Sequence, residues 1–297
     1  MKKPIHSIAG IAICTLLLLG ATLIPEGRML MFNLIGLIVV VAGTLGATFI
    51  SYPKSSIAIA LKVALNSYRT SVPSEKEIVD SLLDLSIKSK LDGLLALEKA
   101  GERASVMFLG RALSMLVDGF KVEELRDALY TEIHFFQHRR AYHERVFRNM
   151  ALLAPAFGVA GGVVGLVGML AGIGDTGVIL KTIPVALTST LYGIILAYFV
   201  FIPIAENIHA RTQEELLIHK LITEGVLLIA QEYNTVRLQA RLQSFLTPHV
   251  RNVQHRSFKE IRDRYEQLKT AKGLPTPPSS SAAPNPPLRS GRTQTKV

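Results

Sequence analysis

The stretch MALLAPAFGVAGGVVGLVGMLAGI, residues 150–173, decides the fold class of this chain. It contains no Asp, Glu, Lys, Arg or His, the side chains that are costly to place inside a bilayer. A helix rises about 1.5 Å per residue and needs roughly 20 apolar residues to cross the hydrocarbon, and this stretch is long enough. We therefore expect residues 150–173 to form a membrane-spanning helix.

Three more apolar runs in the sequence also lack ionisable side chains. Together with the first stretch they predict an all-α integral membrane protein with four transmembrane helices, paired into two hairpins. The hairpins are residues 1–50, with spans at 8–24 and 29–50, and residues 150–205, with spans at 150–173 and 182–205.

The run at residues 8–24 is the shortest, and a cleaved secretory signal is the alternative for it because Lys2 and Lys3 precede it. Its apolar stretch exceeds the roughly 7 to 15 residues of a signal core, and no A-x-A-like site follows. A second apolar run begins after a short turn, as in a helical hairpin. We expect a membrane anchor.

Charge indicates the orientation of the spans and the class of partner. The chain carries a formal net charge of +10, but its Lys and Arg residues gather beside the spans and at the C-terminus, where anionic lipid is a nearer partner than nucleic acid. Basic residues close to span ends stay on the cytoplasmic side. Because the connections 25–28 and 174–181 carry one basic residue each, we expect them outside and both termini in the cytoplasm.

The long connection, residues 51–149, is predicted to be a helical cytoplasmic domain. Ser74 and Glu77 have the spacing of a capping box at a helix start. Glycines at 93 and 119 mark helix ends. From Val122 onward, apolar residues recur at helical spacing without Pro or Gly, so the third span is expected to extend far into the cytoplasm.

The fourth span is expected to extend in the same way, because no proline follows it before Pro248. Residues 206–272 are therefore predicted to be cytoplasmic helices, beginning with a long one beside the extension of the third span. Residues 273–297 are rich in Pro and Ser and basic, and a tail of this composition cannot bury a core, so we expect disorder.

Small residues recur along the third span at alternating intervals of four and three, which places them on one helix face. Small side chains let membrane helices approach closely, so the pattern predicts close packing. A close-fitting wall around a central element is an alternative that is compatible with packing. The residues are Ala154, Gly158, Gly161, Gly165, Gly168 and Gly172.

Two prolines lie near the cytoplasmic ends of the spans, Pro155 in the third and Pro203 in the fourth. A proline inside a helix removes one hydrogen bond and usually kinks it, so each is either an ordinary kink or a hinge. The fourth span also carries a hydroxyl cluster at residues 188–190, which suits either bonding to its own carbonyls or a water-lined path. Proton relays normally use intramembrane carboxylates, so if this chain conducts protons or sodium, another chain must supply the titrating group.

Enzyme signatures are missing from the sequence. It contains no Walker loop, no GxSxG and no GxGxxG, and His143-Glu144 lacks the second His of an HExxH motif. The single Cys14 makes no disulfide framework. We therefore predict neither an enzyme, nor a metal site, nor a bound cofactor.

Several motifs give the chain a family resemblance that covers roughly residues 29–246. In the third span they are LAPAFG at 153–158 and GLVGML at 165–170; in the fourth, VAL at 185–187, TLYG at 190–193 and FIPIA at 201–205; in the connection, GLLALE at 93–98 and LVDG at 116–119. In these motifs the sequence resembles the MotA/PomA family of flagellar motor stators.

The resemblance implies a ring of five such subunits in the bacterial inner membrane, around a dimer of a single-span MotB/PomB partner. That partner supplies the ion-binding Asp and an anchor to peptidoglycan. Ion flow is then expected to turn the ring against the rotor protein FliG. By position, Lys90 and Glu98 match the rotor-contacting residues of the family, although a solvated helix face, with an exposed ion pair worth below about 1 kcal/mol, is the alternative.

The same resemblance assigns Pro155 and Pro203 to coupling and Thr190, beside Ala186, to the ion path. Sodium-driven members carry a Thr where this chain has Gly162, and a hard cation needs several oxygen ligands, so we expect the translocated ion to be H+. A sodium-driven stator stays open, as do an ExbB/TolQ-like energiser, which usually has three spans, and a structural scaffold.

Overall fold

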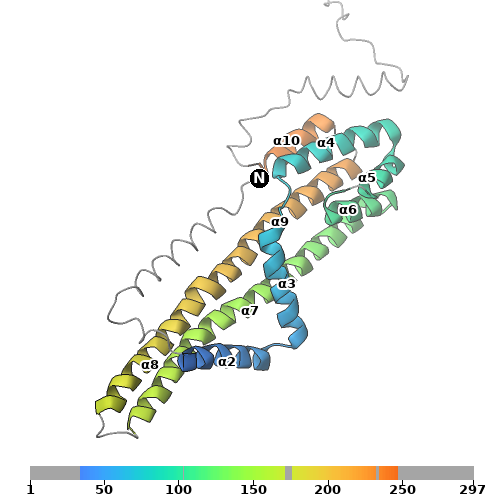
Figure 1. Cartoon of the computed structure of the whole chain (residues 1–297). Coiled ribbons are helices and arrows are strands. Elements are labelled where there is room, and N and C mark those ends of the chain that lie inside the picture. The colour runs from blue at the N-terminus through green and yellow to red at the C-terminus, as the bar shows by residue number, and fades with distance from the viewer. Residues whose placement is uncertain (1–33, 103, 171–175, 232–233, 247–297) are drawn as a thin grey trace, which may run out of the picture.

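The computed structural model describes residues 34–102, 104–170, 176–231 and 234–246, and all the regular structure within these ranges is helical (Figure 1). The predicted span at 8–24 and the tail at 273–297 lie outside the described residues. The elements in chain order are α2 (Leu34–Ser51), α3 (Lys54–Arg69), α4 (Glu75–Asp92), the 3-10 helix η1 (Leu94–Leu97), α5 (Glu98–Glu102), α6 (Met107–Val117), α7 (Val122–Leu170), α8 (Thr176–Ile195), the π-helix η2 (Leu196–Phe201), α9 (Ile202–Ala230) and α10 (Thr235–Gln243).

Helix α7 extends far beyond the apolar run at 150–173, as the helical pattern from Val122 predicts. It has 49 residues, which corresponds to about 70 Å at the usual rise per residue. The segments α8, η2 and α9 return beside it as one long helical run (Figure 1). Within the described residues, three helical segments are long and apolar enough to cross a membrane, Leu34–Ser51, Val122–Leu170 and Ala186–Ala230, so the chain is a multi-pass membrane protein.

The structure gives helix bounds in place of the approximate span bounds predicted from the sequence. The connection at 174–181 includes the first residues of α8, which begins at Thr176, because a helix does not have to end where its apolar part ends. In the region predicted as cytoplasmic helices, α9 ends at Ala230 with Gln231 as its C-cap, and α10 starts after Asn234. Asn is a residue type that favours helix starts, which explains the break.

The helices α7 and α8 pack through backbone at the apolar end of the molecule. A Cβ atom added to Gly158 would lie 3.0 Å from the carbonyl oxygen of Ser189, and one added to Gly193 would lie 2.5 Å from that of Ala154. Gly161 faces the side chain of Ser189 just as closely. The predicted glycine face is therefore a contact with α8. Gly165 adds an ordinary contact with Ala186.

Gly168 has no atom within 4 Å of its Cβ position, in contrast to Gly158, Gly161 and Gly165, while Gly172 lies outside the described residues. Its predicted packing role stays a prediction, for a contact outside this chain. Helix α2 also packs on α7, where the ring of Phe157 rests on Gly43.

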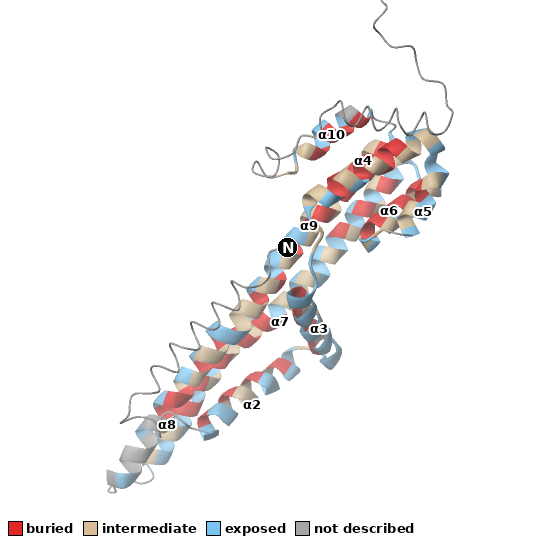
Figure 2. Ribbon diagram, turned by 45° about the horizontal axis from the view of Figure 1, so that its top comes forward, coloured by how far each residue is buried: buried red, intermediate tan, exposed pale blue. Residues whose placement is uncertain are grey.

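The opposite end of the molecule is a helical head, formed by α4, η1, α5, α6 and α10 with the adjoining ends of α7 and α9. The predicted capping box is confirmed: the Glu77 backbone N–H donates to the Ser74 hydroxyl, and the Ser74 N–H donates to the Glu77 carboxylate. One hydrophobic core combines α4 and α6, which come early in the chain, with α10 and the end of α9, which come late. Leu82, Leu113 and Leu221 are fully buried in it, and Figure 2 shows buried positions along these helices.

Between the apolar end and the head, residues 122–149 of α7 and 206–230 of α9 form an antiparallel stalk. Polar side chains join the two helices at four levels, and residue numbers fall along α9 as they rise along α7. The contacts are Tyr130 to Glu224 at 3.1 Å, Arg140 to Glu215 at 2.7 Å, Glu144 to His209 at 3.0 Å and Arg148 to Glu206 at 2.9 Å.

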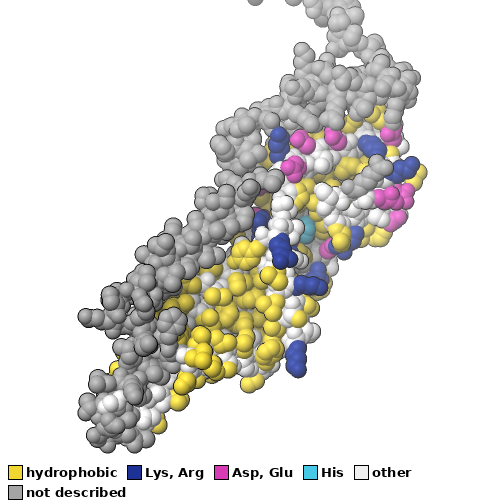
Figure 3. All heavy atoms as spheres, in the orientation of Figure 1, with side chains coloured by type: hydrophobic (Ala, Val, Ile, Leu, Met, Phe, Trp, Pro, Cys, Tyr) yellow, Lys and Arg dark blue, Asp and Glu magenta, His cyan; other side chains and the backbone are white. Residues whose placement is uncertain are grey.

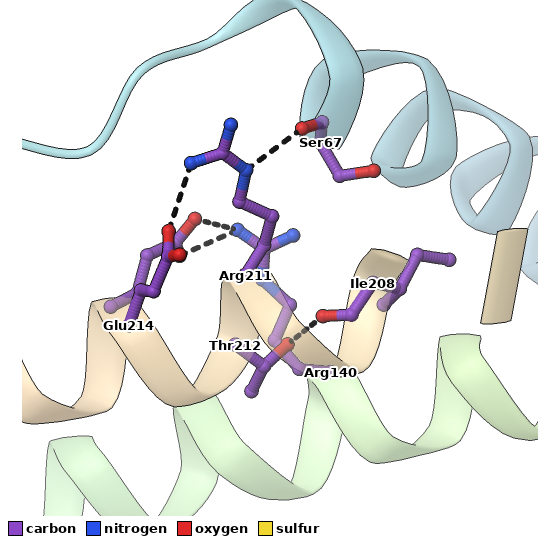
Figure 4. A network of polar contacts seen from close by, with 7 residues as sticks. Ser67, Arg140, Ile208, Arg211, Thr212 and Glu214 are labelled. Carbon is purple, nitrogen blue, oxygen red and sulfur yellow. Dashed lines mark hydrogen bonds and ion pairs between the residues drawn. The ribbon is translucent and has the colours of Figure 1, made fainter. Parts of the chain in front are cut away.

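Arg140 and Arg211 each make two hydrogen bonds in the stalk. Arg140 donates from one nitrogen, Nη2, to both carboxylate oxygens of Glu215, and these charge-assisted hydrogen bonds help to fix the register of the two helices. Arg211 donates to Glu214 and, at 3.1 Å, to the backbone carbonyl of Ser67 at the end of α3 (Figure 4). Helix α3 is thereby attached to the side of the stalk.

His219 lies between two aromatic rings where the head meets the stalk. Its ring stacks on Phe108 with centroids 4.3 Å apart and meets the edge of Phe136 at 4.8 Å. Burial, together with the positive charges of Arg111 and Arg140, lowers the pKa of His219 from 6.5 to about 4. The imidazole is therefore neutral at physiological pH.

We predict that His219 makes the folded chain sensitive to acid. Between pH 6.5 and 4 the unfolded chain binds a proton that the folded chain does not, so stability falls as the pH falls through this window. His219→Phe keeps a ring and cannot titrate, so its thermal midpoint in detergent should fall less between pH 7 and pH 5 than that of the wild type. Parallel slopes for the two proteins would contradict this assignment.

We further predict that Gly193→Ala loosens the contact between α7 and α8. The new methyl group would press on the Ala154 carbonyl, and overpacking of this kind costs about 1–3 kcal/mol. The thermal midpoint of the purified protein should fall. Gly46→Ala is the matched control, since nothing lies within 4 Å of its Cβ position, and it should match the wild type. Equal midpoints for both variants would argue against the contact.

Candidate ion path and rotor-facing surface

Thr190, Gly162 and Ala186, predicted to line an ion path, lie together at the contact between α7 and α8. The Thr190 hydroxyl donates to the carbonyl oxygen of Gly158 at 3.4 Å, and it lies 3.4 Å from the Cβ position of Gly162. The Ala186 carbonyl oxygen is 2.9 Å from the same position. The site therefore presents one side-chain hydroxyl and backbone carbonyls.

This arrangement can orient water or a cation, but it cannot take up a proton at physiological pH. Neither 150–173 nor 182–205 contains an ionisable residue of the carboxylate, amine or imidazole type. Ser189 adds a second hydroxyl, which is fully buried and has no hydrogen-bond partner among the described residues. A proton relay along this wall needs a titrating group from another chain.

Pro155 lies within α7, which continues through it. Its Cα atom is 3.0 Å from the Cβ position of Gly193, so the proline packs directly against the fourth span. Because proline has no N–H, the carbonyl one turn earlier, at Ala151, loses its helical partner. The helix is thus locally weakened at a point where α7 and α8 are held closest together.

Pro203 follows the π-helix η2, a feature that the sequence did not reveal. Proline in a regular helix would clash with the carbonyl four residues before it, and the wider π turn at Leu196–Phe201 immediately precedes it. The Tyr68 hydroxyl of α3 donates to the Pro203 carbonyl at 3.4 Å. Pro203 is thus at the junction between the apolar end and the stalk.

Lys90 and Glu98 lie far from these residues, in the helical head. Lys90 is in the last turn of α4 and Glu98 begins α5, with Gly93 between them at φ +78°. Both side chains are exposed, and neither makes an ion pair with another described residue. Figure 3 shows acidic and basic side chains gathered around this end of the molecule, whereas hydrophobic side chains dominate the coloured surface away from it.

Sequence reasoning named Ala186 for the ion path but missed that it belongs to a row of small residues that packs against the glycine face of α7. Ala186, Ser189 and Gly193 of α8 and Ala197 of η2 are all buried and follow one another at intervals of three or four. The same small-residue spacing that singled out the third span was therefore present in the fourth, where bulky neighbours concealed it. In the ranges that the structure describes, no group of three or more His, Cys, Asp or Glu is placed to hold a metal ion.

Comparisons with known proteins give the chain its family. Residues 100–220 match the model of the MotA/TolQ/ExbB proton channel family. The chain is 30% identical to Motility protein A of Borreliella burgdorferi over 239 residues, 80% of this chain and 91% of the relative. It is 30% identical to chemotaxis protein PomA of Vibrio alginolyticus over 210 residues, 71% of this chain and 82% of that one.

The fold is also that of a solved stator. The structure of the flagellar MotAB stator complex from Bacillus subtilis aligns with a TM-score of 0.76 and 25% sequence identity, covering 82% of this chain and 96% of that one. Similarity to motility proteins thus extends over most of the chain in both sequence and structure. The chain belongs to the MotA/PomA family of flagellar stator proteins, within the broader MotA/TolQ/ExbB proton channel family.

Proposed function

We propose that this chain is the ion-conducting stator subunit of a bacterial flagellar motor and converts proton flow into torque on the rotor, together with a MotB-like partner. The observation that carries the proposal is the wall formed by α7 and α8. It places the Thr190 hydroxyl at a close backbone contact, and neither apolar segment contains a carboxylate. The wall suits an ion path whose titrating group comes from the partner.

The assembly we propose is a ring of five subunits around a dimer of the partner, which contributes an ion-binding Asp. Large apolar side chains remain exposed on α2 and α7; Ile35, for example, is 71% exposed and Leu152 is 75% exposed. In the proposed assembly, lipid and neighbouring chains cover this apolar surface. The ring sits in the bacterial inner membrane, with four spans and both termini in the cytoplasm. The helical head is then cytoplasmic, and Lys90 and Glu98 face FliG.

Pro155 and Pro203 are proposed as the coupling hinge. Pro155 packs against Gly193 of α8, and Pro203 follows η2. Both prolines therefore lie where the contact between α7 and α8 ends and the stalk begins. A change in the ion path near Thr190 reaches the head through the stalk, whose four polar contacts hold α7 and α9 in register. The chain itself has no proposed enzymatic role and no proposed cofactor.

We predict that Thr190→Val gives assembled motors that do not rotate. The valine has nearly the same volume but no hydroxyl, so the path loses its side-chain oxygen while the helices still pack. Thr48→Val is the matched control, because the Thr48 hydroxyl bonds only back to the Thr44 carbonyl at 2.7 Å. Swimming and the torque of tethered cells measure the effect in a strain deleted for the wild-type gene.

A structural scaffold would tolerate Thr190→Val and also Pro155→Leu, and normal rotation of both variants would favour it. A strain that lacks the gene distinguishes a stator from an ExbB/TolQ-like energiser. If the chain is a stator, these cells should keep an intact flagellum but should not swim. Normal swimming with impaired uptake of iron complexes would support the energiser instead.

We predict that rotation depends on protons and not on sodium. The Cβ atom of a side chain placed at position 162 would lie 2.9 Å from the Ala186 carbonyl oxygen. The packing around Gly162 therefore leaves no room for a side chain that adds a hydroxyl ligand for sodium. Motility should persist when potassium replaces sodium in the medium, and a protonophore should stop it. Motility that collapses without sodium and survives the protonophore would show a sodium-driven stator.

A further inference from the structure

The turn between α4 and α5 exposes two leucines at the outer surface of the helical head. Leu95 is 75% exposed and Leu94 is 42% exposed, although both belong to the short helix η1. Exposed leucines are ordinary when they are scattered singly. Here two adjacent ones lie within nine residues of chain that also contain Lys90 and Glu98, the predicted rotor-contacting charges.

Backbone geometry and packing against the core define the conformation of this turn. Gly93 adopts φ +78°, a conformation that favours glycine and directs the chain out of α4. Leu97, at the other end of η1, is fully buried in the core of the head. Behind it, the Cβ position of Gly110 on α6 is 2.9 Å from the Gly101 carbonyl on α5.

Lipid cannot cover these leucines in the proposed orientation. Leu97 belongs to the same core as Leu125 and Leu129 of α7, which lie some twenty residues before the apolar part at 150–173. At about 1.5 Å per residue, η1 is then roughly 30 Å from the hydrocarbon. The occupant of this surface has to be a protein in the cytoplasm.

The charges around the leucines suggest the chemistry of that protein. Lys90 and Glu98 lie on either side of η1 in the chain, and both are exposed without an ion pair among the described residues. An apolar centre within a polar rim is the usual anatomy of a protein interface, in which the centre carries most of the affinity. Opposite charges at the rim set orientation and partner choice.

We propose that Leu94 and Leu95 form the apolar centre of the rotor-facing surface, with Lys90 and Glu98 as its rim. The occupant is one face of a helix on the rotor protein, carrying an apolar side chain between an acidic and a basic one. This inference rests on the proposed stator function. It differs from a purely charged contact because it assigns binding to the leucines and orientation to the charges.

Leu95→Ser tests the proposal in the full motor. It should reduce the torque of tethered cells at least twofold, while the purified complex keeps the wild-type amount of partner chain and the wild-type thermal midpoint. Leu95→Met keeps an apolar side chain and should restore torque. Phe135→Ser, which changes another exposed apolar residue, 55% exposed on the stalk, should leave torque unchanged.

A photo-crosslinking amino acid at position 95 identifies the occupant in living cells. An adduct with the rotor protein supports the proposal, and an adduct with a second copy of this chain overturns it. Unchanged torque in Leu95→Ser together with no adduct also overturns it. If Lys90→Glu and Glu98→Lys still impair torque in that case, the stator function survives and only the apolar centre is wrong. If deletion of the gene leaves swimming normal, the stator function itself fails.

Discussion

The close backbone contact between α7 and α8 is the constraint on which the rest of this structure depends. Apolar surface gains nothing by leaving lipid for another apolar surface, so helices in a membrane associate through packing and polar contacts, which favour small residues. Gly158 and Gly193 let the two backbones meet with no side chain between them. The oxygens available at this contact are therefore carbonyls and the hydroxyls of Ser189 and Thr190, none of which titrates at physiological pH, as the proposed ion path requires.

The stalk connects the contact between α7 and α8 to the helical head. Helices α7 and α9 extend without interruption from the apolar end into the helical head, and ion pairs at several levels prevent them from sliding past each other. Pro155 and the π turn before Pro203 interrupt the regular hydrogen bonding at the junction. The proposed coupling uses this junction as the hinge that passes a displacement beside Thr190 to the head.

Much of this arrangement follows from periodicity in the sequence. The apolar run at 150–173, its glycine face and the uninterrupted helical pattern from Val122 predict α7, and the capping box of Ser74 and Glu77 predicts the start of α4. These signals are local, and each has a direct physical cause. The proximity of Thr190, Gly162 and Ala186 was predicted from the family resemblance, and the structure shows the three together.

The features that escaped prediction depend on contacts between distant segments. The end of α9 at Ala230 lets α10 fold onto α4, where Leu238 and Leu242 complete the core, and this tertiary packing adds to the local preference of Asn234 for a helix start. The ion pairs of the stalk and the stacking of His219 between Phe108 and Phe136 require the antiparallel register of α7 and α9 to be known first. The π turn at Leu196–Phe201 has no sequence signature beyond the proline that follows it.

The central claim is that this chain forms the wall of an ion path and borrows its titrating carboxylate. Proton flux into vesicles under an imposed pH gradient tests it most directly. The vesicles would contain the chain alone, the chain with its single-span partner, or the chain with a partner whose intramembrane Asp is changed to Asn. The account predicts flux only with the unaltered partner, and equal flux through the chain alone would contradict it.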